Sequence, residues 1–311
     1  NWNMQIYRQL LGLAAKDKGA SCALGNFDGV HLGHQSVLDV ARVHGPLGII
    51  TFEPHPRAFF NPTNTAPFRL MNAKARTHEM ARLGVKNLYE LPFNTEMAAL
   101  SPRDFAKLIL QEGLGVSHVV VGADFCFGAG RSGRAKDLVS LGKEFGFGVT
   151  VSQLLHTSGA EISSTAIRQA LKEGDPQLAQ QMLGHPHRIE GPVIHGEKRG
   201  RDLGYPTANM AVSDLHLPKL GVYAVLVDVL TGPFKGSYKA ASSLGVRPMF
   251  GKNQPNLESF LFDFSGDLYG AELSVAFVAY LRPELKFDGL QELRDQMAKD
   301  CAQARTILEP L

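Results

Sequence analysis

The segment that most constrains this chain is residues 20–43, where a short apolar run leads through a glycine-rich stretch into a helical pattern. The apolar run at 20–24 predicts the end of a buried strand, and the apolar spacing of residues 35–43 predicts a helix. Two histidines, His31 and His34, stand where the strand gives way to the helix. Free backbone amides at a helix N-terminus favour a bound phosphate, so the segment predicts a nucleotide site.

The first half of the chain alternates strand and helix patterns. Buried strands are predicted at residues 48–52, 87–91, 118–121 and 148–154, and helices at 73–83, 102–112, 135–145, 164–172 and 176–183. This alternation is typical of crossover units on a parallel sheet, so an α/β domain is predicted. Ligands of such sheets bind at the carboxyl ends of the strands, where the two histidines and Asp124 fall.

The second half has a different pattern. Strands are predicted at residues 188–195, 221–230, 236–244, 257–264 and 271–281, with few helical patterns between them. Direct strand-to-strand connections favour a small antiparallel β-barrel. Apolar residues at helical spacing over 289–308 predict a C-terminal helix against the barrel. The pattern breaks at Gly184, which predicts two domains, 1–184 and 185–311.

Composition excludes several classes of partner. The formal net charge of +2 gives no argument for nucleic acid or an anionic membrane, and no apolar run approaches the ~20 residues of a membrane helix. Three scattered cysteines argue against a disulfide framework or a zinc-finger type of metal site. With no signal peptide evident, we expect a cytoplasmic protein of two domains. The sequence leaves the oligomeric state open.

A second anion-binding segment is predicted where Ser163, Ser164 and Thr165 precede a helix that carries Arg168 one turn further on. Taken alone, such a Ser-Ser-Thr run is more often only a helix cap, and an isolated His-x-Gly-His is as often a turn. The two segments together, within an alternating α/β domain, favour nucleotide chemistry.

Residues 24–34 and 162–168 resemble the two signature motifs of the HxGH nucleotidyltransferase superfamily. Residues 51–56 and 122–128 resemble one branch, the adenylyltransferase half of bacterial bifunctional riboflavin kinase/FAD synthetases. The resemblance implies a Rossmann-like nucleotidyltransferase domain. It also implies the ATP-binding residues Gly25, Phe27, His31, Gly33, His34, Ser163, Ser164, Thr165 and Arg168, and the flavin- or FMN-binding residues His55, Asp124 and Phe125.

Two of these assignments have simpler alternatives. The segment around His55 can be explained by loop packing, and Asp124 by turn capping. The acidic charge of Asp124 suits a sugar hydroxyl or magnesium better than a phosphate.

The second half contains a glycine-rich basic segment at residues 196–209 that can form a loop over phosphates. Thr207 and Asn209 offer neutral oxygen ligands two residues apart, on one face of an extended chain. Mg²⁺ with ATP is commonly held by one or two protein oxygens plus phosphates. A surface loop followed by a capped turn is the alternative.

Glu258 opens an apolar stretch and shares a strand face with Phe260, Phe262 and Phe264. If this face points inward, Glu258 is a carboxylate at the mouth of the barrel. Among aromatic side chains a carboxylate tends to have a raised pKa and can serve as a general base. An exposed glutamate at a strand end is the alternative.

Residues 201–209, 244–248, 258–260 and 267–270 resemble riboflavin kinase segments in the same order, so the whole chain resembles the bifunctional enzyme. The resemblance implies that Glu258 is the base, and that Mg-ATP binds at Gly196, Gly200, Arg201, Gly204, Pro206, Thr207 and Asn209, with Thr207 and Asn209 as metal ligands. The chain departs from the family pattern in having Ser243-Leu244 for Asn-Ile, and Met249 for Thr. These departures put local contacts with the flavin or nucleotide in doubt.

The predicted function is a pair of ATP-dependent steps that use Mg²⁺. The first phosphorylates riboflavin to FMN with Glu258 as base, and the second adenylylates FMN to FAD with His31, His34 and Arg168 as catalytic residues. Three alternatives are a kinase with its first half kept as a scaffold, a flavin- or nucleotide-binding regulator without turnover, and a transferase acting on another phosphorylated acceptor.

Overall fold

The computed structural model describes residues 3–10, 13–63, 66–157, 160–196, 201, 203–249 and 252–311. The chain forms two compact units. The first unit comprises Asn1–Thr65 with Arg76–Ile162, and the second comprises Ala66–Ala75 with Ser163–Leu311. The predicted domain boundary at residue 184 stays a prediction.

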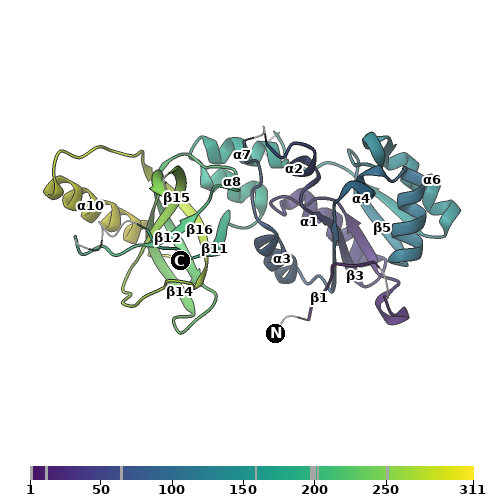
Figure 1. Cartoon of the computed structure of the whole chain (residues 1–311), viewed down its shortest axis with the longest axis horizontal. Coiled ribbons are helices and arrows are strands. Elements are labelled where there is room, and N and C mark those ends of the chain that lie inside the picture. The colour runs from purple at the N-terminus through teal and green to yellow at the C-terminus, as the bar shows by residue number, and fades with distance from the viewer. Residues whose placement is uncertain are drawn as a thin grey trace. The chain divides into compact units, whose positions relative to one another are not determined.

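The first unit is built on the parallel sheet that contains β1, β3 and β5 in Figure 1. Its strand order is β1-β4-β3-β2-β5-β8. Its strands are β1 (Gln5–Tyr7), β2 (Ser21–Leu24), β3 (Leu47–Glu53), β4 (Asn87–Pro92), β5 (His118–Gly122) and β8 (Gly148–Ser152). Neighbouring strands pair in parallel throughout. The predicted parallel α/β architecture is confirmed.

Helices connect these strands. They are α1 (Leu32–Val43), α2 (Pro56–Phe60), α3 (Ala73–Arg82), α4 (Thr95–Ala99), α5 (Pro102–Asp104), a π-helix (Phe105–Gly113) and α6 (Ala135–Phe145), with 3₁₀ turns at Ala15–Asp17 and Ala129–Arg131. Two small antiparallel hairpins pair β6 (Cys126–Phe127) with β7 (Gly133–Arg134), and β9 (His156–Thr157) with β10 (Ala160–Glu161).

The helix predicted at residues 102–112 is present, but most of it is of a different helix type. Ser101 caps its first turn and Pro102 begins it, but from Phe105 onward the chain is a wider π-helix. This geometry still buries Phe105, Ala106, Ile109 and Leu110 in the core of the unit. The apolar pattern alone does not distinguish the two helix types.

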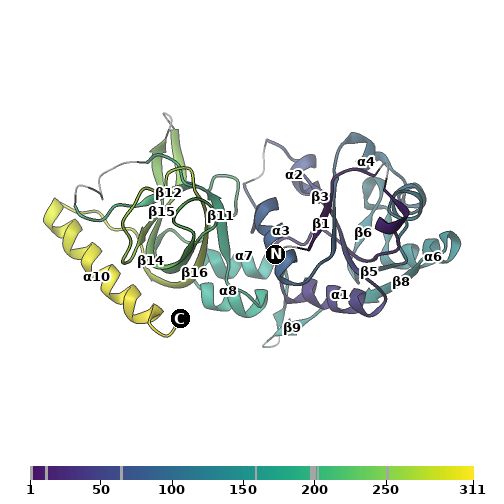
Figure 2. The ribbon, with the colours of Figure 1, turned by 90° about the horizontal axis from the view of Figure 1, so that it is seen from below.

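The second unit contains an antiparallel sheet with strand order β11-β16-β13-β14-β15-β12. Its strands are β11 (Arg188–Pro192), β12 (Ala208–Ala211), β13 (Gly221–Val229), β14 (Gly236–Met249), β15 (Lys252–Leu261) and β16 (Glu272–Arg282). A bridge between Ile194 and Asn209 joins the two edges of the sheet and closes it into the barrel seen in Figure 2. The predicted barrel is confirmed.

Helices flank the barrel within this unit. They are α7 (Ser164–Lys172), α8 (Pro176–Leu183) and the C-terminal α10 (Leu290–Leu308). Helix α10 packs Ala304 and Leu308 against Phe262 on the outer surface of the barrel, as its apolar spacing predicts. Across the described segments, no helix combines the length and apolar character needed to cross a membrane.

Candidate active sites

The histidine segment occupies the carboxyl end of β2 and the start of α1. The Gly25 N–H donates to the Ile50 carbonyl, which continues the β2–β3 register by one residue. The chain then turns sharply, with positive φ angles at Phe27, Gly29 and Val30. A β-branched valine rarely adopts φ of +47°, so the loop holds this residue in a costly conformation.

His31 and His34 form a reciprocal cap at the N-terminus of α1. The His34 N–H donates to Nδ1 of His31, and the His31 N–H donates to Nδ1 of His34. The rings stack with centroids 3.5 Å apart. Burial, with a smaller effect of His31, holds the pKa of His34 well below its usual range, so this imidazole is neutral at physiological pH.

Gly33 and Phe27 shape the space around the two rings. A Cβ on Gly33 would lie 2.8 Å from Cε1 of His31, so the glycine makes room for that ring. It would also lie 3.8 Å from the carbonyl oxygen of Ile162, the residue that immediately precedes Ser163 in the chain. Phe27 is buried and meets the edge of the His34 ring at 5.2 Å. These two predicted ATP residues therefore support the histidines.

A buried arginine supports the backbone of this loop. Arg76 of α3 is 0% exposed and donates through one terminal nitrogen to the Asn26 carbonyl, 3.3 Å away. Its other terminal nitrogen lies 2.7 Å from Glu53 and 3.5 Å from Glu90. Thr51 donates to the same Asn26 carbonyl. The interior ion pairs thus anchor the backbone that leads to the histidines.

The predicted flavin contacts lie after the two strands adjacent to β2. His55 follows β3, caps α2 and accepts the Arg57 N–H at Nδ1. Asp124 and Phe125 follow β5, where Asp124 is exposed and Phe125 stacks on Phe127. Because these strands run parallel, the three residues share a sheet edge with the histidine loop.

The second predicted anion segment begins α7, in the second unit. The Ser163 hydroxyl accepts the Ala166 N–H and so caps the helix, while Ser164 and Thr165 occupy its first turn. Arg168 donates from Nε to the Phe68 carbonyl at 2.6 Å and lies over the Phe68 ring. The capping alternative thus holds for Ser163, and the Arg168 guanidinium is held in place by a defined partner.

Most of the predicted Mg-ATP residues of the barrel line one cavity of about 470 Å³. Its lining includes Gly196, Arg201, Pro206, Thr207 and Asn209. Gly204 does not line it, and Gly200 lies outside the described residues.

Aromatic and amide groups border this cavity. His195 and Tyr269 stack there with centroids 3.7 Å apart. A Cβ on Gly196 would overlap the Asn209 amide, so this glycine is required where the chain passes that side chain. Of the predicted Mg-ATP residues, the structure thus gathers Gly196, Arg201, Pro206, Thr207 and Asn209 around one cavity.

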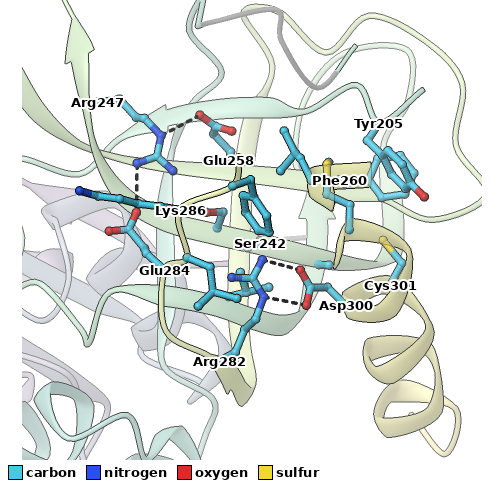
Figure 3. Close-up of a pocket in the computed structure, with 17 residues that line it drawn as sticks. Tyr205, Ser242, Arg247, Glu258, Phe260, Arg282, Glu284, Lys286, Asp300 and Cys301 are labelled. Carbon is cyan, nitrogen blue, oxygen red and sulfur yellow. Dashed lines mark hydrogen bonds and ion pairs between the residues drawn. The ribbon is translucent and has the colours of Figure 1, made fainter. Parts of the chain in front are cut away.

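Glu258 lies on β15 beside a second cavity of about 450 Å³ (Figure 3). Asn209 of β12 pairs with Glu258 across the sheet on one side. Ser243 of β14, one of the departures from the family pattern, pairs with Glu258 on the other side. Nε of Arg247 lies 3.8 Å from Glu258, and the same guanidinium bonds Glu284 at 3.0 Å. The half-buried carboxylate thus sits at a wall of the cavity, within reach of a bound molecule.

The face that carries Glu258 is the outer surface of the barrel. Leu257 and Leu261 belong to the interior core, whereas Phe260 and Phe262 pack with α10. The inward orientation considered from the sequence is therefore wrong, because Phe260 and Phe262 of this face pack towards the helix. Leu293 and Met297 of α10 complete the apolar wall of the cavity.

The fold and these sites define a two-part enzyme of phosphoryl and nucleotidyl transfer. The chain matches the family model described as FAD synthetase over residues 13–166, and the model described as riboflavin kinase over residues 183–308. The chain belongs to the family of bifunctional riboflavin kinase/FMN adenylyltransferases. The predicted family, fold class and pair of activities are confirmed.

Individual relatives cover nearly the whole chain. A bifunctional riboflavin kinase/FMN adenylyltransferase of Pseudomonas fluorescens is 40% identical over 313 residues, 99% of each chain. The protein of the same description from Escherichia coli K12 is 37% identical over 97% of each chain. A crystal structure from Streptococcus pneumoniae, described as a macrolide-efflux protein, is 30% identical with a TM-score of 0.81, covering 97% of this chain and 98% of that one.

Sequence reasoning missed two residues at these sites. Arg76 lies in a helix whose pattern marks it as polar, but the structure buries it beside Glu53 and Glu90. Asn256 precedes Glu258 by two residues and bonds both Glu258 and Asn209. Its position two residues before the predicted base was the one available signal.

Proposed function

We propose that Thr207, Asn209 and Glu258 carry out the phosphorylation of riboflavin, and that His31, His34 and Arg168 carry out the adenylylation of FMN. The observation that most supports the first assignment is the register pairing of Asn209 with Glu258. It sets a predicted Mg-ATP ligand beside a predicted base on neighbouring strands. The cavities beside Glu258 and Asn209 share Phe260, and we assign them to riboflavin and ATP.

In the kinase step the primary ribityl hydroxyl loses its proton as its oxygen bonds to the γ-phosphorus of ATP. The bond from that phosphorus to the ADP oxygen breaks, and ADP leaves. Glu258 accepts the proton, and Arg247 orients its carboxylate.

The oxygens of Thr207 and Asn209 suit Mg²⁺. Both residues line one cavity, and neutral oxygen donors fit an ion that is held mainly by nucleotide phosphates. Bound there, Mg²⁺ would offset the negative charge of the phosphates. Gly196, Gly200, Arg201, Gly204 and Pro206 complete the proposed phosphate loop.

The adenylyl transfer does not need a general base. An FMN phosphate oxygen attacks the α-phosphorus of ATP, and the bond to pyrophosphate breaks. The nucleophile is already an anion, so no base is required. His31 and His34 would donate from Nε2 to phosphate oxygens, while Ser164, Thr165 and Arg168 hold the triphosphate.

Several further assignments form part of this proposal. His55, Asp124 and Phe125 contact the flavin or its phosphate, and Asp124 serves a sugar hydroxyl or magnesium. The partners are the small molecules ATP, riboflavin and FMN, without nucleic acid or membrane. We place the protein in the cytoplasm and the functional boundary at residue 184.

The test is incubation with riboflavin, ATP and Mg²⁺, followed by separation of riboflavin, FMN and FAD over time. Glu258→Gln is expected to lower FMN formation about 10²-fold or more while FAD forms normally from supplied FMN. Equal loss of both activities would contradict the assignment of Glu258.

The same assay separates the alternatives. Pyrophosphate release from FMN and ATP excludes an enzyme with kinase activity alone. Tight flavin binding with no product would favour a regulator. Adenylylation of another phosphorylated acceptor in preference to FMN would favour the third alternative.

A further inference from the structure

Asn256 lies between the proposed base and the proposed metal ligand of the kinase site. It is 3% exposed, and its Nδ2 donates to Oδ1 of Asn209 at 3.1 Å and to Oε1 of Glu258 at 3.2 Å. Asn256 and Glu258 are two residues apart on β15, so their side chains share a face, and Asn209 pairs with Glu258 across the sheet. One amide group therefore connects both functional side chains.

The orientation of this amide is determined by its partners. A primary amide has two N–H donors on nitrogen and only acceptor sites on oxygen. With Nδ2 towards Asn209 and Glu258, each hydrogen meets one acceptor oxygen. In the reversed orientation Oδ1 would face two acceptor oxygens. The buried Oδ1 has no hydrogen-bond partner among the described residues.

We propose that Asn256 is a positioning residue of the kinase reaction, which aligns the Glu258 carboxylate with the Asn209 amide oxygen. This inference rests on the proposed function of those two residues. A neutral donor suits this place, because a second cation beside Glu258 would hold its carboxyl ionised and weaken it as a base.

Other charged groups lie around Glu258. Arg247 faces it from β14 and is shared with Glu284, which follows β16. Further along the same cavity, Arg282 is paired with Asp300 of α10, and Lys286 lines the wall. A change at residue 256 leaves all of these groups in place.

The deciding variant is Asn256→Asp, which keeps the shape of the side chain and replaces the donor by a carboxylate. Two neighbouring carboxylates resist joint ionisation, so the acidic limb of the kinase kcat profile should move up by about one pH unit. The KM for Mg-ATP should also rise, because Asn209 loses its donor. FAD formation from supplied FMN should be unchanged.

The matched control is Asn253→Asp, which makes the same change at an exposed position of the same strand. It should leave the pH profile at its wild-type position. If Asn256→Asp does not fold, Asn256→Ala takes its place, with kcat expected to fall and the KM for Mg-ATP to rise, each about tenfold.

The outcomes separate this inference from the proposed function. A wild-type pH profile and KM in Asn256→Asp, or unchanged kinase kinetics in Asn256→Ala, would overturn the positioning role. If Glu258→Gln retains riboflavin phosphorylation, the base assignment itself fails. If Glu258→Gln is inactive while the Asn256 variants behave as wild type, only the positioning role fails.

Discussion

His31 and His34 each accept the backbone N–H of the other at Nδ1, over 3.2 and 3.1 Å. An imidazole that accepts at Nδ1 carries its proton on Nε2 when neutral. The cap therefore sets the tautomer of both rings and leaves Nε2–H as the donor side. The helix start and the chemistry proposed for phosphate binding depend on the same two bonds.

Substitution of His31 by asparagine separates these two roles. Asparagine is a good N-cap residue, so His31→Asn should keep α1 intact. The shorter side chain no longer places an N–H donor where Nε2 of the imidazole lies. We expect FAD formation from FMN to fall about 10²-fold, with FMN formation from riboflavin unchanged. Thermal unfolding checks that the cap survives. Normal FAD synthesis in a folded His31→Asn protein would remove His31 from the mechanism.

Gly33→Ala tests the placement of the His31 ring without removing any functional group. The added Cβ would come within 2.8 Å of Cε1, so the ring must turn away from its bond with the His34 N–H. We expect a loss of FAD synthesis of at least tenfold and little change in riboflavin phosphorylation. Steady-state assays of both reactions on the same preparation measure this difference, and equal kinetics in the variant would contradict the steric argument.

Arg76→Met tests the support beneath the histidine loop. The substitution removes the buried cation beside Glu53 and leaves Glu90 with Arg8 as its remaining ion-pair partner, and breaking a buried pair typically costs about 3–5 kcal/mol. The free energy of unfolding of the first unit should fall by that order, and FAD synthesis should be lost at a lower temperature than kinase activity. Urea unfolding gives the first quantity. A change below about 1 kcal/mol would show that the pairs contribute little.

The parts of the fold that could be predicted are those with a strong local pattern. Strands β2 and β3 are apolar runs buried by the parallel sheet, and α7 begins at a plain Ser cap. Strand β12 was not predicted, because its four residues follow a turn-like segment and pair with β15 only through long-range contacts.

The site residues were also predictable only where a local motif marked them. Motif spacing identified Asn209 and Glu258 separately, but their pairing depends on the register of two strands far apart in the chain. Asn256 gains its position from that register, and Arg76 of helix α3 is buried where it pairs with Glu53 of β3 and Glu90 of β4. Such roles arise from tertiary packing, which single-residue patterns do not encode.

His187 makes the stability of the second unit sensitive to acid. Its side chain is 4% exposed, stacks on Phe277, and has an Nε2 without a hydrogen-bond partner in the described part of the chain. Burial, with smaller contributions from His185 and His216, lowers the pKa of His187 to about 3. Protonation would place an unpaired charge in the interior, so the folded state resists it.

The direction of the pH effect follows from this lowered pKa. Above a pH of about 6.5 the ring is neutral in both states and contributes no pH dependence. As the pH falls from there towards 3, the unfolded chain binds a proton that the folded chain does not, and stability drops by up to about 1.4 kcal/mol per pH unit. His187→Phe should remove this contribution. Urea unfolding of the second unit at pH 7, 6 and 5 measures both slopes, and parallel slopes for the two proteins would show that His187 is not the acid-sensitive group.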